Sequence, residues 1–216
     1  MTNWIPVLNN QNKIESTISE IKEELKTSPE NSELLNDLGV GYYLLGQYEN
    51  AIHQLNKAVQ LSPDMAVYHY NLANAYAENN QPERAINFYH LAIEADAEHI
   101  PSINNLADCY ELTGEHTKAH ELFQYLVRID PDNPLSHFNL GNFFLRQNQH
   151  IEAVKCYEET IKRDPEFADA YFNIGWVLQQ AKAYREALDY SEKGLNSDPE
   201  HEELMRLKKE LKKILN

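Results

Sequence analysis

Apolar residues recur along this chain at the intervals expected for one side of an α-helix, with polar residues between them. Across residues 34–45 and again across 50–61, apolar residues recur at helical intervals, so each range is predicted to form an amphipathic helix. Gly46 separates the two ranges, and glycine readily takes the left-handed conformation that ends a helix. The pattern therefore predicts two helices joined by a tight reversal of the chain.

The same two-helix pattern recurs five times at a step of 34 residues. An alanine early in the second helix keeps this step, at Ala51, Ala85, Ala119, Ala153 and Ala187. A small residue in the first helix keeps it too, at Gly39, Ala73, Ala107, Gly141 and Gly175. We expect these small residues to lie where two helices approach closely. A fixed period of this length predicts a stack of two-helix repeats rather than a closed globule.

Residues that favour turns mark the ends of the predicted helices. The place of Gly46 is taken in later repeats by Asn80, Gly114 and Asn148. Lys182 stands there in the fifth repeat, where we expect it to carry backbone strain. Proline disfavours helix in the residue before it, and it closes four repeats, at Pro63, Pro131, Pro165 and Pro199.

The period and the pattern resemble those of the tetratricopeptide repeat. Segments such as DLGVGYYLLGQYENAIHQLNKAVQLSP (37–63) and NLGNFFLRQNQHIEAVKCYEETIKRDP (139–165) carry the resemblance. It covers five repeats, at 32–65, 66–99, 100–133, 134–167 and 168–201. The resemblance implies an all-α fold, a right-handed α-solenoid of antiparallel helix pairs. The fifth repeat departs from the family pattern, because Ser191 and Gly194 replace the usual aromatic residue and alanine, so we expect looser packing there.

Both ends of the array are predicted to be capped, since terminal repeats would otherwise expose an apolar face. Residues 1–31 combine a tail with a helix over 14–27, which we interpret as an N-terminal capping half-repeat. The tail is expected to pack over the first helix or, alternatively, to occupy a groove of its own or a neighbouring chain. Its apolar residues are Trp4, Ile5, Val7 and Leu8.

Residues 202–216 are predicted to form a C-terminal capping helix. One side of this helix carries an apolar stripe, at Leu204, Leu207, Leu211 and Ile214. Its other positions are locally basic, with Arg206, Lys208, Lys209, Lys212 and Lys213. The stripe leaves an alternative open, in which the chain is a structural subunit that forms homo-oligomers through its terminal helices. A basic amphipathic helix also binds membrane surfaces in some proteins, and we rank that interpretation last.

In the resembling family, the first helix of each pair lines a concave groove. One groove position of this chain reads Asp37, Asn71, Asn105, Asn139 and Asn173, and a second position adds Asn74, Asp108 and Asn142. An amide both donates and accepts hydrogen bonds, so a row of amides can hold an extended peptide backbone. The row is similar to the asparagine ladder of O-linked N-acetylglucosamine transferases. Asparagine is also frequent here across the family, so the alternative is an inherited pattern without a ligand.

Large apolar side chains stand between these asparagines. The candidate anchors for a partner are Tyr43, Tyr70, Phe138, Phe172 and Trp176. Aromatic side chains dominate binding energy when a partner buries them, and we choose Trp176 as the candidate hot spot. Some of these aromatic side chains are expected to pack against neighbouring repeats instead. The Lys and Arg clamp of family members that bind chaperone C-termini is missing from the matching positions.

Composition excludes several function classes. A net charge of −15 argues against a nucleic-acid partner and favours a basic partner, or serves solubility alone. No phosphate loop, nucleophile motif or metal motif is present, so we expect no cofactor and no enzyme activity. His116 and His120 lie four residues apart without a third metal ligand nearby. Cys109 and Cys156 have no metal-like spacing and are expected to be reduced.

These observations predict a non-catalytic scaffold or adaptor. Its groove is expected to bind an extended segment of another protein. The chain shows neither a signal peptide nor an apolar run long enough to span a membrane, so we expect a cytoplasmic location and no membrane partner.

Overall fold

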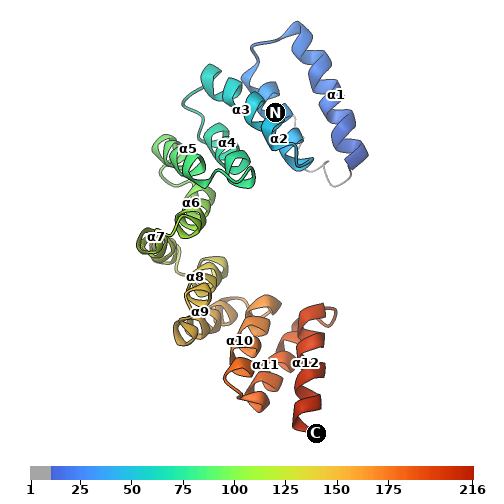
Figure 1. The fold of residues 1–216 in the computed structure, drawn as a ribbon, viewed down its shortest axis with the longest axis vertical. Helices are drawn as coiled ribbons and strands as arrows, with labels where there is room; N and C mark the ends of the chain where they lie inside the picture. Colours follow the sequence, from blue (N-terminus) through green and yellow to red (C-terminus); the bar gives the residue numbers. More distant parts are fainter. Residues whose placement is uncertain (1–10) are drawn as a thin grey trace. The chain divides into compact units, whose positions relative to one another are not determined.

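A computed structural model describes residues 11–216, in which every regular element is an α-helix (Figure 1). The helices in chain order are α1 (Gln11–Thr27), α2 (Ser32–Leu44), α3 (Tyr48–Leu61), α4 (Ala66–Glu78), α5 (Pro82–Ala95), α6 (Ile100–Leu112), α7 (His116–Ile129), α8 (Pro134–Arg146), α9 (His150–Arg163), α10 (Ala168–Gln180), α11 (Tyr184–Ser197) and α12 (Glu202–Leu215). The predicted all-α fold is confirmed. The chain forms two compact bodies, an N-terminal body that ends at Leu122 and a C-terminal body that begins at Phe123.

Successive helices pair within each body. In the N-terminal body α2 packs against α3 and α4 against α5, while α1 covers α2. In the C-terminal body α8 packs against α9 and α10 against α11, while α12 covers α11. The first helices of neighbouring pairs also touch, α2 with α4, α4 with α6 and α10 with α12. Each body therefore presents a surface made only of first helices, which we call its first-helix face.

The small residues of the periodic pattern lie at the closest helix contacts. All five alanines that keep the 34-residue step have no exposed surface. Gly39 shows why the position must be small, because a Cβ atom there would lie 2.5 Å from Leu55 Cγ. Gly141 would meet the Tyr157 ring at 2.7 Å in the same way. The packing role that the sequence predicts for these positions is confirmed.

The predicted turns have the expected backbone. Gly46 and Gly114 adopt φ values of 69° and 81°, and Asn80 and Asn148 adopt 57° and 58°. Lys182 has a φ of 61°, in the left-handed region that side chains other than those of glycine and asparagine rarely enter. The expectation of strain at Lys182 is therefore confirmed.

Two of the loops between repeats are held by histidines. His69 Nε2 lies 2.7 Å from the carbonyl oxygen of Pro63. His137 Nε2 lies 2.9 Å from the carbonyl oxygen of Pro131, in the equivalent place two repeats later. Each imidazole is buried and ties the start of a first helix to the loop that precedes it. These contacts hold the starts of α4 and α8 against the loops that precede them.

The two terminal helices bury their apolar stripes inside the chain. On α1, Ile14, Ile18 and Ile21 are buried against Leu38. The apolar stripe of α12 is buried at Leu204, Leu207 and Leu211, whereas Ile214 remains 50% exposed. The tail residues Trp4, Ile5, Val7 and Leu8 lie outside the described residues.

The basic side of α12 is partly neutralised by the preceding helix. Lys208 Nζ lies 3.2 Å and Lys212 Nζ 3.5 Å from the same carboxylate oxygen of Glu192 on α11. These ion pairs join the helix to its own body. With its apolar stripe, they give α12 the contacts of a capping helix.

The expectation of loose packing in the fifth repeat is wrong. Gly194 is buried, and a Cβ atom there would lie 2.6 Å from Leu204 Cδ1 and 2.8 Å from Tyr171 Cβ. Ser191 has no exposed surface, and its hydroxyl donates to the Ala187 carbonyl oxygen at 2.8 Å. The small residues are present because α12 and α10 approach α11 closely at this point.

Candidate functional site

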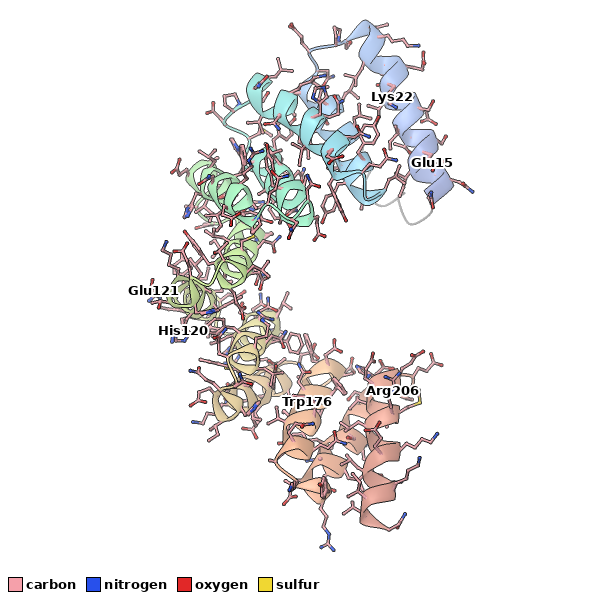
Figure 2. All side chains as sticks on the ribbon, viewed as in Figure 1. Glu15, Lys22, His120, Glu121, Trp176 and Arg206 are labelled. Carbon is pink, nitrogen blue, oxygen red and sulfur yellow. The ribbon has the colours of Figure 1, made fainter. Side chains whose placement is uncertain are left out.

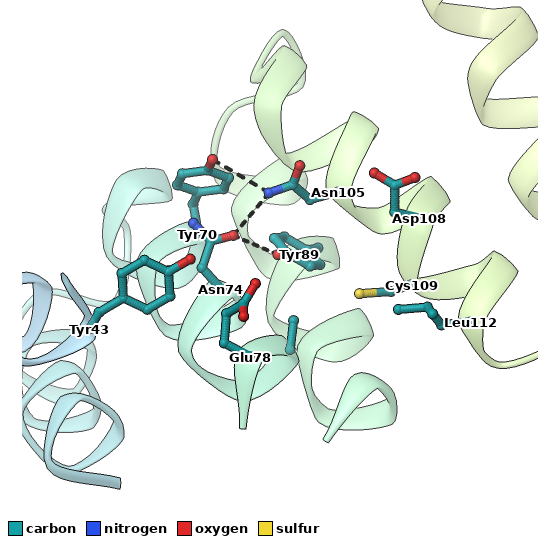
Figure 3. A pocket seen from close by; sticks show the side chains of 10 residues that line it. Tyr43, Tyr70, Asn74, Glu78, Tyr89, Asn105, Asp108, Cys109 and Leu112 are labelled. Carbon is teal, nitrogen blue, oxygen red and sulfur yellow. Dashed lines mark hydrogen bonds between the residues drawn. The ribbon is translucent and has the colours of Figure 1, made fainter. Parts of the chain in front are cut away.

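The first-helix face of the N-terminal body contains a hollow of about 310 Å³. We call it the α4–α6 hollow (Figure 3). The residues that line it are Tyr43, Tyr70, Asn74, Ala77, Glu78, Tyr89, Asn105, Asp108, Cys109 and Leu112. Four of the predicted groove residues, Tyr43, Tyr70, Asn74 and Asn105, are thus brought together in one place.

Hydrogen bonds hold the Asn74 amide at the floor of this hollow. The buried Tyr89 hydroxyl on α5 donates to Asn74 Oδ1 at 2.6 Å. Asn105 Nδ2 on α6 donates to the same oxygen at 3.0 Å (Figure 3). Because both donors point at Oδ1, the amide is fixed by three helices. Within the described part of the chain, the Asn74 amide nitrogen donates to no other residue.

The C-terminal body repeats this arrangement 68 residues further along the chain. Tyr157 on α9 donates its hydroxyl proton to Asn142 Oδ1 at 2.8 Å. Asn173 Nδ2 on α10 donates to the same oxygen at 3.2 Å. The Asn142 amide is therefore held in the same way as that of Asn74, and its nitrogen likewise has no acceptor among residues 11–216.

Burial keeps both tyrosines of these networks protonated. Tyr89 is 1% exposed and Tyr157 has no exposed surface. Loss of solvent around each ring is the largest cause that raises the pKa of its hydroxyl well above the ordinary value. Both hydroxyls remain donors at physiological pH, so the orientation of the two amides does not change with pH in that range.

The other predicted asparagines have different surroundings. Asn71 donates from Nδ2 to Asn36 Oδ1 at 2.8 Å, and Asn36 is buried. Asn139 is half-buried on α8. Each of Asn71, Asn105 and Asn173 thus donates an amide proton to an asparagine on the preceding first helix. The asparagines three residues later, Asn74 and Asn142, have amide protons left for a ligand.

Three of the predicted aromatic anchors, Tyr43, Tyr70 and Phe138, are half-buried. Tyr43 lies at the edge of the α4–α6 hollow, and Tyr70 packs against the Tyr89 and His99 rings at centroid distances of 6.2 and 5.1 Å. Phe138 packs against Tyr157 and Phe167, at 5.6 and 4.7 Å, which makes it part of the helix packing.

A second hollow, of about 170 Å³, lies on the first-helix face of the C-terminal body. We call it the α10–α12 hollow, and it is lined by Phe172, Trp176, Gln179, Glu203, Arg206, Leu207 and Glu210. Trp176 of α10 is 37% exposed and lies on the same side of this body as Arg206 of α12 (Figure 2). The predicted anchors Phe172 and Trp176 therefore meet in one hollow.

Sequence reasoning missed several residues of these sites. Tyr89 and Tyr157 were not singled out, although they stand 68 residues apart, as Asn74 and Asn142 do. A search for a period of two repeats would have found all four. Leu112 was missed as well, and its 76% exposure is the largest among the exposed large apolar side chains of residues 11–216.

Within residues 11–216, no three His, Cys, Asp or Glu side chains gather in a way that could hold a metal ion, and the pair of His116 and His120 has no third ligand there. Cys109 and Cys156 are free thiols, and burial raises the pKa of each to about 11. No helix in the same range is both long and apolar enough to span a bilayer.

Family models match the chain over most of its repeats. Residues 39–80 match the TPR repeat model and residues 66–99 the tetratricopeptide repeat model. Residues 103–206 match the middle TPR-like domain of cilia and flagella-associated protein 70. The chain belongs to the tetratricopeptide-repeat family.

Solved structures of tetratricopeptide-repeat proteins have similar folds. MamA is 26% identical, with a TM-score of 0.65 over 74% of this chain and 93% of MamA. YrrB, described as a TPR protein with an unusual peptide-binding site, is 19% identical, with a TM-score of 0.60 over 88% and 97% of the two chains. PilF of Pseudomonas aeruginosa is 20% identical, with a TM-score of 0.69 over 85% and 84%.

The similarities to YrrB and PilF concern the fold alone. No curated protein matches the sequence significantly. The tetratricopeptide-repeat fold supports a role as a protein-interaction scaffold, because stacked helix pairs expose long faces on which a partner can lie.

Proposed function

We propose that this tetratricopeptide-repeat protein is a non-catalytic adaptor whose first-helix faces bind an extended segment of another protein. The observation that carries the proposal is the α4–α6 hollow. In it the amide of Asn74 is held by two hydrogen bonds, beside side chains that solvent can reach.

The fixed amide supports binding of a peptide backbone. Asn74 keeps its amide nitrogen as a donor, and a carbonyl oxygen of an extended segment is a suitable acceptor. Because Tyr89 and Asn105 already hold the amide, little side-chain entropy is lost when a ligand binds. The same argument applies to Asn142 in the C-terminal body.

Exposed apolar side chains support the same function. Leu112 is 76% exposed at one edge of the α4–α6 hollow, and Trp176 is 37% exposed in the α10–α12 hollow. Burying such side chains under a partner would contribute roughly 25 cal/mol for each Å² removed from water. A polar backbone contact beside an apolar anchor is the usual composition of a peptide site.

The alternative of self-assembly through the terminal helices has less apolar surface available. Leu204, Leu207 and Leu211 are buried within the C-terminal body, which leaves Met205, Ile214 and Leu215 exposed on α12. We therefore place the first-helix faces ahead of the chain ends as the working surface.

The test is a selection of random peptides, displayed on phage, against the full chain. Binding of a selected peptide is then measured with wild type, with Leu112→Ser and with Leu91→Ser. Leu91 is a matched control, because it is 40% exposed but lies on α5, a second helix. A parallel comparison uses Trp176→Ala for the C-terminal body.

We expect Leu112→Ser or Trp176→Ala to weaken binding about tenfold, which corresponds to about 1.4 kcal/mol for a buried anchor. Leu91→Ser should bind as wild type does. Peptides that bind all variants equally, or a selection that enriches no peptide, would refute the proposal.

A further inference from the structure

The first helices of the N-terminal body carry charges of one sign. Within the printed bounds of α2, α4 and α6 there is no Lys or Arg. The same helices carry five carboxylates, at Glu33, Asp37, Glu78, Asp108 and Glu111. The second helices differ, because α3 contains Lys57 and α5 contains Arg84. The first helices of this body therefore carry only negative charge, in keeping with the net charge of the whole chain.

The α4–α6 hollow combines two of these carboxylates with aromatic rings. Glu78 and Asp108 are its charged lining residues, and Tyr43 and Tyr70 are among its aromatic ones. In Figure 3, the Glu78 side chain lies between those of Tyr43 and Tyr89. The charge of Glu78 raises the pKa of the Tyr43 hydroxyl, after the larger effect of burial, which agrees with its position near that ring.

The residues that line the α4–α6 hollow suit both parts of a long basic side chain, its charged end and its aliphatic stem. Carboxylates attract a guanidinium or ammonium group, and the faces of tyrosine rings attract it further. The aliphatic stem of such a side chain needs an apolar surface, which Leu112 offers at the edge of the hollow. A neutral side chain would use only part of this surface, and an acidic one would be repelled.

We propose that the α4–α6 hollow binds an arginine or lysine side chain of the extended segment, so that the partner carries a basic residue in its docking sequence. The exposed Glu78 pairs with the cation, Asp108 adds negative charge to the lining, and Tyr43 contributes its ring. Asn74 bonds the backbone next to it. The inference rests on the proposed function, since it names the chemistry of the segment that binds there.

The experiment uses three alanine-based pentapeptides, acetylated and amidated, with a central arginine, citrulline or glutamate. Citrulline keeps the shape of arginine but has a carbonyl oxygen in place of one guanidinium nitrogen, so it lacks the positive charge and two of the five N–H donors. Binding to the isotopically labelled full chain is followed by NMR, through the side-chain amide signals of Asn74 and Asn105. Glu78→Gln is compared with Glu83→Gln, which makes the same charge change at an exposed position on α5.

We expect the arginine peptide to shift these amide signals and to bind about tenfold more tightly than the citrulline peptide, as an ion pair and a cation–π contact together allow. Glu78→Gln should reduce this preference about threefold, and Glu83→Gln should not change it. The preference should also fall as salt is added.

Equal binding of the arginine and citrulline peptides at these amides would overturn the inference while the face would still bind peptides. No shift with any of the three peptides would overturn it as well. The proposed function is then judged separately by the random-peptide selection, which does not assume a basic residue.

Discussion

At the scale of single residues, Lys182 holds a backbone conformation that glycine or asparagine holds at the four equivalent turns. A left-handed residue with a side chain costs about 1 kcal/mol relative to glycine. We therefore expect Lys182→Gly to raise the free energy of unfolding by about that amount. Lys182→Ala, which removes the side chain beyond Cβ but keeps the strain, should leave stability near that of wild type. Urea denaturation of the three chains checks this, and equal midpoints for Gly and Ala would contradict it.

The hydrogen bonds around Asn74 predict that substitutions of Asn74 and Tyr89 have coupled effects on stability. Asn74→Ala would leave the buried Tyr89 hydroxyl without its acceptor and should cost about 2 kcal/mol of stability. Adding Tyr89→Phe removes the stranded hydroxyl, so the double variant should be less destabilised than the sum of the two single variants. Strict additivity in a double-mutant cycle would show that the hydroxyl and the amide do not interact.

The two cysteines predict that the stability of the fold depends on pH. Burial raises the pKa of Cys109 and of Cys156 to about 11, from 9.0 for an ordinary thiol. The folded chain therefore holds these protons more tightly than the unfolded chain, so the stabilising contribution is complete below about pH 9 and is lost as the pH rises toward 11. At pH 7.5, iodoacetamide should alkylate the folded chain much more slowly than the urea-unfolded chain. Equal rates would contradict the burial of Cys109 and the partial burial of Cys156.

Residue-level chemistry was predictable where it depends on the repeat alone. The buried alanines, the turn at Gly46 and the strain at Lys182 follow from the 34-residue step, because each position has the same neighbours in every repeat. The hydrogen bond of Asn105 could not be predicted from the 34-residue step. Its amide points to Asn74 on another helix, and only the distance between the two side chains shows that it is used internally.

At the scale of helices, Gly194 on α11 gives the sharpest prediction. Helix propensity alone would make Gly194→Ala stabilising, by about 0.5–1 kcal/mol. The added Cβ would instead meet Leu204 Cδ1 and Tyr171 Cβ at 2.6 and 2.8 Å, and overpacking of this kind costs about 1–3 kcal/mol. We expect a net loss of stability.

Asn196→Ala on the same helix is the matched control, because Asn196 is exposed and its replacement brings only the gain in helix propensity. Thermal unfolding should therefore move in opposite directions for the two variants. A higher melting temperature for Gly194→Ala would restore the sequence-based view that the fifth repeat is loosely packed.

Helix positions were more predictable than helix contacts. The predicted ranges 14–27 and 202–216 correspond to α1 and α12, which begin or end within a few residues of those limits. The sequence left open whether the stripe on α12 covers its own chain or another copy. The burial of Leu204, Leu207 and Leu211 against α10 and α11 depends on an approach distance that periodicity does not contain.

At the scale of the whole molecule, the two bodies contain the same hydrogen-bond network, in which a tyrosine hydroxyl and a neighbouring asparagine together fix one asparagine amide. The two networks lie 68 residues apart in the sequence. Their surroundings differ. The N-terminal network lines the α4–α6 hollow together with Glu78 and Asp108, whereas the residues that line the α10–α12 hollow, among them Trp176 and Arg206, include none of the C-terminal network. The family pattern predicted a row of equivalent asparagines, whereas the structure has two asparagine amides, Asn74 and Asn142, that are fixed by hydrogen bonds.

The central claim is that partners lie on the first-helix faces. The most direct measurement is a map of backbone amide NMR shifts in the full chain when a peptide from the random selection is added. We expect shifts concentrated on α2, α4 and α6 around Asn74 and Leu112, or on α10 and α12 around Trp176. Shifts concentrated on the second helices α3, α5, α9 and α11 would contradict it.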